Sequence, residues 1–281
     1  MYTIGADPEL FIRDNRSGGV TPACDIFGGT KGAPVPLGNL PEGFGLQEDN
    51  VMLEFNIPPA KGVWDLVEYM QRAREALDEI VRTSGDFEID KSASRLFHRN
   101  LLTNSKAQEF GCSPDFNAYA GGAPIQPLDR TLLVDGDGEW RFAGGHIHIG
   151  YNNPDIPHHV VGALCDAIIA CTVVEDDIQG KRRTFYGSAG RYRPTSYGIE
   201  YRTLSNFWIW EDGLVEHIAN RVHTLCSILH EVPVGVLQRA YIALNWGDIR
   251  ECINTEDVEM SFRTCDHISM TFEQEGITNG V

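Results

Sequence analysis

The sequence lacks several features that mark common protein classes. Its seven cysteines include no CxxC pair and are odd in number, which argues against a disulfide framework or zinc knuckle and indicates a reducing compartment. No apolar run approaches the length of a membrane span, and the N-terminus MYTIGADPELFI has neither the basic start nor the apolar core of a signal peptide. We therefore expect a cytoplasmic protein with no membrane partner.

Basic residues are also scarce. With 23 Lys and Arg against 40 Asp and Glu, the net charge is −17, so long-range repulsion opposes binding to nucleic acid, although a local basic pocket is compatible with it. There is no P-loop, so any nucleotide is bound by other means. No internal repeat or low-complexity linker divides the 281 residues, and the apolar fraction of 42% is that of an ordinary globular protein. A single domain over residues 1–281 is expected.

Helical and strand patterns alternate along the chain. Apolar residues recur at helical spacing over 62–85, 157–177 and 211–232, and a shorter helix is expected after Pro233. Residues 132–151 are predicted to form a hairpin that turns at DGDG (135–138). DGDG also resembles part of a calcium-binding loop, but the other ligands of such a loop are missing. The stretch after about residue 254 is acidic and weakly patterned, so no element is predicted there. Antiparallel strands with helices inserted between them define an α+β fold.

One stretch, AGGHIHIGY (143–151), raises the question of function. In a strand, His146 and His148 share one face, while Ile147, Ile149 and Tyr151 share the other. The simplest interpretation is a half-exposed strand whose histidines face water. Matching polar faces on other strands would favour a functional site instead.

Three further strands carry such faces. Asp7 and Glu9 lie two residues apart, roughly 6–7 Å along a strand. Glu54 lies on the polar face of a second strand, and Glu200 shares a face with Arg202 on a third. Gathered in one place, these groups would repel one another without a cation, and oxygen-rich sites with an occasional imidazole suit Mg²⁺ or Mn²⁺. The candidate metal ligands are Asp7, Glu9, Asp49, Glu54, His146 and Glu200.

Basic residues crowd into one segment, GKRRTFYGSAGRYRPTSYGIEYR (180–202). Arginine binds phosphate oxygens in bidentate fashion, so such a cluster beside a metal site favours a bound phosphate group. The alternative is a solvated loop that balances acidic neighbours. The residues concerned are Lys181, Arg182, Arg183, Arg191, Arg193 and Arg202.

Five motifs, in order along the chain, resemble a known family: GADPELF, DNVMLEFN, GCSPDFNAY, GGHIHIGY and GSAGRYRPTSYGIEYRTLSNFWI. Together they resemble the COOH·NH2 ligases (amidoligases) encoded in bacteriophage genomes, of the glutamine synthetase and glutamate–cysteine ligase superfamily. The motifs cover about residues 1–210 and leave a helical part of about 211–281. The resemblance implies a curved antiparallel half-barrel, flanked by helices, whose polar inner face binds ATP and Mg²⁺ or Mn²⁺. It also implies the host cytoplasm as location.

The resemblance further implies roles for single residues. Asp7, Glu9, Glu54, His146 and Glu200 match metal ligands, with Asp49 a further ligand, and His148 matches a phosphate or nucleotide contact. Arg202 matches the arginine that touches the transferred phosphoryl group. Arg191 and Arg193 would face phosphates or the carboxylate substrate. The basic cluster, rather than the resemblance, predicts Arg182 and Arg183 as nucleotide contacts. Pro8 departs from the family pattern and implies an edge or bulge in the first strand, which leaves the role of Asp7 least defined.

The implied reaction joins a small-molecule or peptide carboxylate to an amine through an acyl phosphate. It needs no covalent enzyme intermediate, so Cys112 is a packed or functional thiol rather than a nucleophile. Two alternatives stay open: a metal-dependent hydrolase that uses no ATP, and a non-catalytic binding protein with the same fold. Three aromatic residues are compatible either with a homo-oligomer contact or with the core: Phe207, Trp208 and Trp210.

Overall fold

The N-terminal strands join two antiparallel sheets. The computed structural model describes residues 2–109 and 115–278. One sheet has the order β1-β13-β15-β14-β9-β10 and the other β3-β2-β6-β5-β4, with β7 also paired to β2. Their bounds are β1 Thr3–Ala6, β2 Glu9–Asp14, β3 Gly19–Thr21, β4 Val35–Pro36, β5 Gly45–Asp49, β6 Met52–Asn56, β7 Phe87–Asp90, β9 Phe116–Asn117, β10 Ala123–Pro124, β13 Ile147–Gly150, β14 Arg191–Thr195 and β15 Gly198–Tyr201.

The link between β1 and β2 joins the two sheets into one curled surface. Asp7 and Pro8 form the link. The Phe55 amide of β6 donates to the Pro8 carbonyl (3.4 Å), and the amide of Ile57, just after β6, donates to the Ala6 carbonyl (3.3 Å). Pro8 has no N–H to place in a ladder, which explains why the strand is interrupted there. The predicted α+β class and curved antiparallel half-barrel are confirmed.

A third, smaller sheet has the order β11-β12-β8. The hairpin of β11 (Val134–Asp135) and β12 (Gly138–Phe142) turns through residues 136 and 137, as the DGDG stretch predicts, and β8 (Ser94–His98) pairs along the other edge of β12. After Phe142 the chain leaves this sheet and enters β13 of the first sheet. The histidine strand therefore does not continue the hairpin, although the two are adjacent in sequence.

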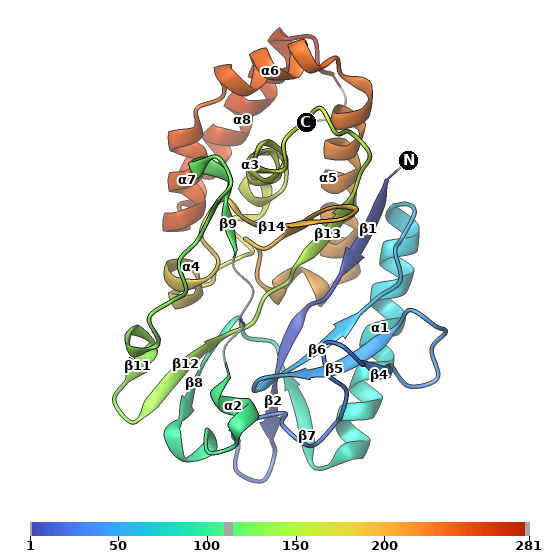
Figure 1. Ribbon diagram of the computed structural model, residues 1–281, viewed down its shortest axis with the longest axis vertical. Coiled ribbons are helices and arrows are strands. Elements are labelled where there is room, and N and C mark those ends of the chain that lie inside the picture. Colours follow the sequence, from blue (N-terminus) through green and yellow to red (C-terminus); the bar gives the residue numbers. More distant parts are fainter. Residues whose placement is uncertain (1, 110–114, 279–281) are drawn as a thin grey trace.

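The helices surround the sheets (Figure 1). Those of four residues or more in α conformation are α1 Val63–Ser84, α2 Ser105–Gln108, α3 His158–Ile168, α4 Lys181–Phe185, α5 Asp212–Glu231, α6 Val234–Ala243, α7 Trp246–Thr255 and α8 Val258–Gln274. In Figure 1, α3 and α5 to α8 lie together at the upper end, α1 runs beside the sheets and α2 lies at the lower end. The predicted helices at 62–85 and 211–232 and the helix after Pro233 are confirmed. The helix expected over 157–177 ends at Ile168 and gives way to the 3₁₀ turn η4 (Ala170–Val173).

The main core lies between the sheet and these helices. Ile147, Ile149, Ile199 and Tyr201 are fully buried on the helix-covered face, in one cluster with residues of α1, α3, α5, α7 and α8. Trp208 belongs to the same core and its indole N–H donates to the Gly145 carbonyl at 3.1 Å, so it is a core residue rather than a subunit contact. Among the described helices, none is long and apolar enough to cross a membrane.

A buried carboxyl, Asp166 of α3, ties this helix to the sheet. It accepts hydrogen bonds from the hydroxyls of Tyr201 (2.5 Å), Tyr119 (2.8 Å) and Thr203 (3.3 Å), and it is fully buried. We expect Asp166→Ala to lower the free energy of unfolding by about 3 kcal/mol, because three hydroxyls lose their acceptor. Urea denaturation would measure the loss. Exposed Asp176→Ala serves as the control, and a loss no larger than that of the control would contradict this role.

Candidate functional site

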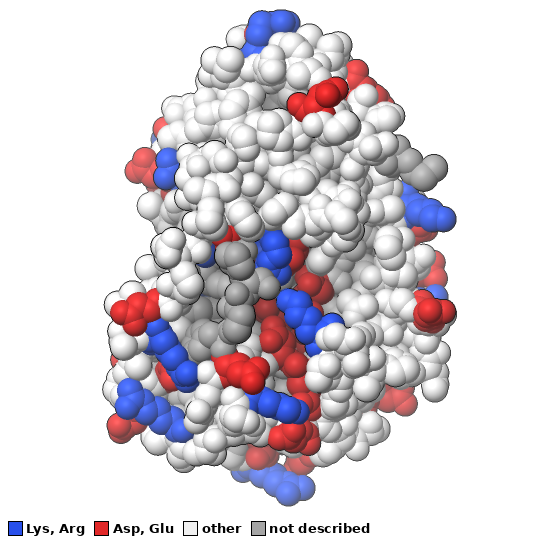
Figure 2. All heavy atoms as spheres, in the orientation of Figure 1, with Lys and Arg blue, Asp and Glu red and all other residues white. Residues whose placement is uncertain are grey.

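The strand registers gather the predicted site residues on the open face of the curled sheet. Glu200 on β15 lies between His148 on β13 and Arg193 on β14. Glu54 on β6 lies in the same way between Glu9 on β2 and Gln47 on β5. Figure 2 shows Asp and Glu side chains along a hollow of this surface, with Lys and Arg beside them. The face opposite the apolar core is therefore the polar one that the alternation predicts.

Asp7, His148 and Glu200 form a first group of ligand-type atoms, all within 4.8 Å of one another. His148 Nε2 lies 3.0 Å from Asp7 Oδ1, and its Nδ1 is bonded to the Tyr197 hydroxyl. A hydroxyl on one ring nitrogen fixes the imidazole so that the other nitrogen faces the carboxylates, as is usual for metal-binding histidines.

His146 lies beside this group but is bonded differently. Its Nδ1 lies 3.6 Å from both Asp7 and Glu200, and 3.2 Å from the Arg202 guanidinium. Burial and the charge of Arg202 lower the pKa of His146 to about 3, so the ring is neutral and Nδ1 accepts the Arg202 N–H. The structure thus groups His148, rather than His146, with two carboxylates.

Glu9, Asp49 and Glu54 form a second group, again with ligand atoms within 4.8 Å of one another. Glu9 Oε2 accepts the Gly144 amide N–H at 2.6 Å, and Glu54 Oε1 accepts the Gln47 side-chain amide at 2.5 Å. Asp49 ends β5, where the chain turns into β6. Each group therefore combines residues from neighbouring strands, and the fold divides the predicted ligands into two sets.

Crowding raises the pKa of several of these carboxyls. Burial and the charge of Asp49 raise the pKa of Glu9 to about 7, and burial and the charge of Asp7 raise that of Glu200 to about 7. Burial, with the charges of Asp7 and Glu9, also raises the pKa of Glu54 well above its ordinary value. Asp7 behaves oppositely: burial opposes ionisation, but His148 and His146 lower its pKa. A bound cation would stabilise the ionised form of carboxylates in such surroundings.

Three arginines border the first group. Arg202 donates to Glu200, and its Nε lies 2.9 Å from Asp115 Oδ1. Arg193 donates to Glu200 at 3.0 Å, and Arg191 to Asp115 at 3.3 Å. Asp115 is thus a common partner of the three arginines. This edge of the site therefore holds three guanidinium groups against two buried carboxylates.

Arg182 and Arg183 are not on the open face. Both are buried in α4, where Arg182 donates to the carbonyls of Thr203 (2.9 Å) and Arg202 (3.2 Å), and Arg183 to that of Gly187 (2.7 Å). Lys181 is exposed and pairs with Asp135 at 2.9 Å. Arg182 and Arg183 therefore bind and stabilise the backbone around Arg202.

The glycine pair before the histidines is required by close packing. A Cβ on Gly145 would lie 2.1 Å from the Ser205 carbonyl oxygen, and one on Gly144 would lie 2.2 Å from His146 Nε2. The segment after β15 bonds to this pair through the Gly145 amide and the Leu204 carbonyl (3.1 Å). Glycine at these two positions therefore allows the segment before β13 to pack closely against the segment after β15.

Some neighbours of the site had not been singled out in the sequence. Tyr197 and Tyr186 bond to His148 and Arg202, and Gln47 bonds to Glu54. Of these three residues, only Gln47 could have been predicted from the sequence, because it lies two residues before Asp49 and therefore on the same strand face. Cys112 lies outside the described residues. No disulfide joins the cysteines of the part that the structure describes.

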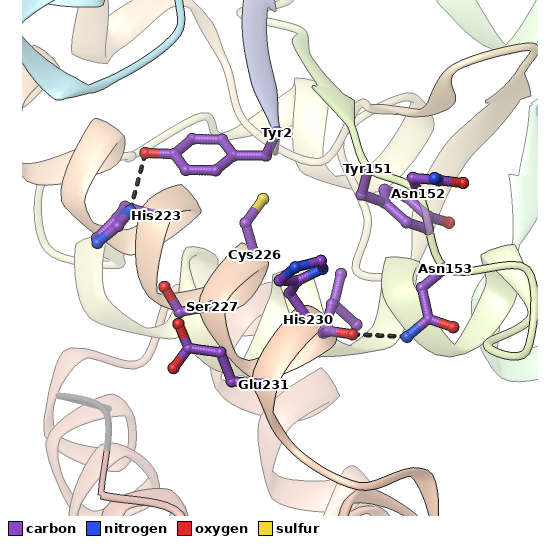
Figure 3. A pocket seen from close by; sticks show the side chains of 10 residues that line it. Tyr2, Tyr151, Asn152, Asn153, His223, Cys226, Ser227, His230 and Glu231 are labelled. Carbon is purple, nitrogen blue, oxygen red and sulfur yellow. Dashed lines mark hydrogen bonds between the residues drawn. The ribbon is translucent and has the colours of Figure 1, made fainter.

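A separate pocket lies at the other end of β1 (Figure 3). It is lined by Tyr2, by residues that follow β13 and by one side of α5, and the Tyr2 hydroxyl bonds to His223 Nδ1 at 2.8 Å. It contains none of the predicted site residues. We therefore place the chemistry on the acidic face of the sheet.

Comparison with known protein families gives a match that includes residues of this acidic sheet face. Residues 139–241 match the model of the phage phiEco32-like COOH.NH2 ligase, type 2. The match confirms the family resemblance drawn from the motifs, and it supports a carboxylate–amine ligase, an enzyme that forms C–N bonds. The matched segment runs from β12 into α6 and contains His146, His148, Glu200 and the three arginines. Comparison with curated proteins gives no match.

Proposed function

We propose that this protein is an ATP-dependent carboxylate–amine ligase that forms an amide through an acyl phosphate. The observation that carries the proposal is the pair of ligand groups on one sheet face beside three arginines. Four of the residues concerned, Asp7, Glu9, Asp49 and Glu54, lie outside the segment that matches the family. The fold nevertheless brings them to the residues within it, which supports one site built from both.

The donor set fits divalent metal ions. Five carboxylates and one imidazole form the two groups, the oxygen-rich chemistry that Mg²⁺ and Mn²⁺ prefer. In addition, the buried atoms Asp7 Oδ1 and His148 Nε2 lie 3.0 Å apart, and beyond this contact neither has a hydrogen-bond partner among the described residues. Ions held by these residues would neutralise the phosphate charges of ATP.

The chain's own residues supply the remaining requirements. Arg202 is positioned by His146, Glu200 and Tyr186, and it would bind the phosphoryl group as a substrate carboxylate oxygen attacks the γ-phosphorus and ADP leaves. Arg191 and Arg193 would bind phosphate or the substrate carboxylate. The amine nitrogen then attacks the acyl carbon, loses a proton and displaces phosphate, which leaves the amide.

Two measurements test this proposal. Calorimetry should show ATP binding in Mg²⁺ or Mn²⁺ and none in chelator, because the acidic face repels free ATP. With hydroxylamine as the amine and a panel of amino acids and peptides as carboxylates, ADP formation should require both. Equal ATP affinity with and without metal would contradict the proposal, and carboxylate hydrolysis that needs metal but no ATP would indicate a hydrolase instead.

A further inference from the structure

Helix α7 ends on a glutamate in a conformation that glutamate rarely adopts. Glu256, which follows Thr255, has a φ of +57° and a ψ of +36°, the left-handed conformation that glycine usually supplies at a helix C-terminus. Among the described residues other than glycine, only Asp25 and Asn50 also have a positive φ. A side chain kept at such a position costs free energy, which points to contacts that this side chain makes.

The Glu256 side chain binds the start of α4. Its Oε1 accepts the backbone N–H groups of Gln179 at 2.7 Å and Gly180 at 3.0 Å. The side chain is only 17% exposed, so water competes little for these bonds. Arg183 Nε lies 3.8 Å from the same oxygen, too far for a hydrogen bond. The two backbone N–H groups are therefore the main partners of the carboxylate.

Asn254, in the last turn of α7, binds the other end of the same segment. Its Oδ1 accepts the Ala189 backbone N–H at 2.8 Å, two residues before β14 begins at Arg191. Two side chains at one helix end thus bind residues 179–189 near both ends. The bound segment belongs to the part of the chain that matches the family, whereas α7 lies outside it.

The segment that α7 binds in turn supports Arg202. The Arg182 guanidinium donates to the carbonyls of Arg202 (3.2 Å) and Thr203 (2.9 Å). The Gln179 side chain accepts from Arg182 and donates to the Thr203 carbonyl at 3.1 Å. The Tyr186 hydroxyl accepts a hydrogen bond from the Arg202 guanidinium. The backbone and the side chain of Arg202 are therefore both bonded to the segment whose position α7 fixes.

We propose that Glu256 is a positioning residue for phosphoryl transfer, because it holds α4 and thereby Arg202 in place. This inference rests on the proposed function, in which Arg202 binds the transferred phosphoryl group. Asn254 assists on the side of β14. Hydrogen bonds to a transition state depend steeply on geometry, so a shift of Arg202 by about 1 Å is enough to slow the reaction.

Amide hydrogen exchange of the full chain tests the contact without any ligand. Glu256→Ala removes the acceptor of two backbone N–H groups, so peptides that cover residues 179–189 should exchange about tenfold faster than in the wild type. Glu256→Gln keeps an oxygen acceptor and should exchange like the wild type. Glu251→Ala, at an exposed glutamate of the same helix, is the matched control.

Turnover of the same variants tests the role in the reaction. ADP formation with hydroxylamine and a carboxylate should show a kcat about tenfold lower in Glu256→Ala and close to the wild type in Glu256→Gln. The affinity for AMP-PNP with Mn²⁺ should fall less than kcat, because Arg202 acts mainly in the transition state. Turnover is expressed per site that binds AMP-PNP in calorimetry, so an unfolded fraction does not lower it.

Glu256→Gly separates the helix end from the side chain. Glycine adopts a positive φ at no steric cost, so this variant keeps the end of α7. It should nevertheless exchange and turn over like Glu256→Ala, because both variants lack the carboxylate. Wild-type exchange and turnover in Glu256→Gly would show that the residue only ends the helix, and would overturn the proposal.

The remaining outcomes are distinguishable. Unchanged exchange in Glu256→Ala would overturn the contact, and faster exchange with a wild-type kcat per site would overturn its role in the reaction. Both results leave the proposed function standing. A wild type that neither binds AMP-PNP with Mn²⁺ nor forms ADP would overturn the proposed function and the positioning role with it, whatever the exchange shows.

Discussion

Glu9→Gln is expected to stabilise the metal-free protein at pH 8 and to reduce the stabilisation that Mg²⁺ provides. Burial and the charge of Asp49 raise the pKa of Glu9 from 4.5 to about 7. A carboxyl with a raised pKa in the folded state contributes stability at low pH and loses it as the pH rises through the folded pKa. At pH 8 the ionised Glu9 therefore costs about 3 kcal/mol, which glutamine removes while keeping an oxygen for the Gly144 amide.

Urea denaturation at pH 5 and pH 8, with and without Mg²⁺, would measure both effects. The variant and the wild type should differ little at pH 5, where the carboxyl is protonated in the folded state. At pH 8 without metal the variant should be the more stable, and with Mg²⁺ the order should reverse. Glu251→Gln, at an exposed position, is the control. A wild type that gains no stability from Mg²⁺ would count against the second ligand group.

The polar face of the sheet was predictable because the strand period is two. Alternation in HIHIG and MLEFN assigns each side chain to a face without any knowledge of neighbouring strands. The registers, which place Glu200 beside His148 and Glu54 beside Glu9, are long-range properties that alternation does not contain. The division of the ligands into two groups therefore required the structure.

Other features were hidden because composition does not report surroundings. Arg182 and Arg183 belong to a basic run that resembles a phosphate site, yet backbone carbonyls bind both guanidinium groups. The last helix, α8, was not predicted because its buried face includes Ser261, Thr264 and Thr271, which mask the apolar period. In both cases polar groups occupy buried positions, where sequence patterns are least informative.

The prediction made for Pro8, between Asp7 and Glu9, was partly correct. Pro8 was expected to mark an edge or bulge, and in the structure it marks the junction of two sheets. Asp7 consequently belongs to the first ligand group and Glu9 to the second, although only one residue separates them. A continuous strand would direct both carboxylates to one ion. The junction instead distributes them between two groups.

The two histidines provide the sharpest test of the site. We expect His148→Ala to lose metal from the group with Asp7 and Glu200 and to abolish amine-dependent ADP formation. Metal affinity should fall at least about 100-fold, since loss of a partner that merely orients a ligand already costs 10- to 100-fold. The reason is geometric: Tyr197 binds one nitrogen of His148 and leaves the other facing two carboxylates.

His146→Ala should behave differently, because the Nδ1 of this ring accepts a hydrogen bond from Arg202. The variant should keep its metal and lose turnover, with kcat falling more than nucleotide affinity, since Arg202 loses its support near the phosphoryl group. Anomalous scattering from Mn²⁺-soaked crystals of both variants would give the occupancies. The family pattern implies His146 as the metal ligand, whereas we propose His148, which the structure groups with Asp7 and Glu200. If the site empties in His146→Ala and stays filled in His148→Ala, the family pattern prevails, and a site filled in both would make the carboxylates alone sufficient.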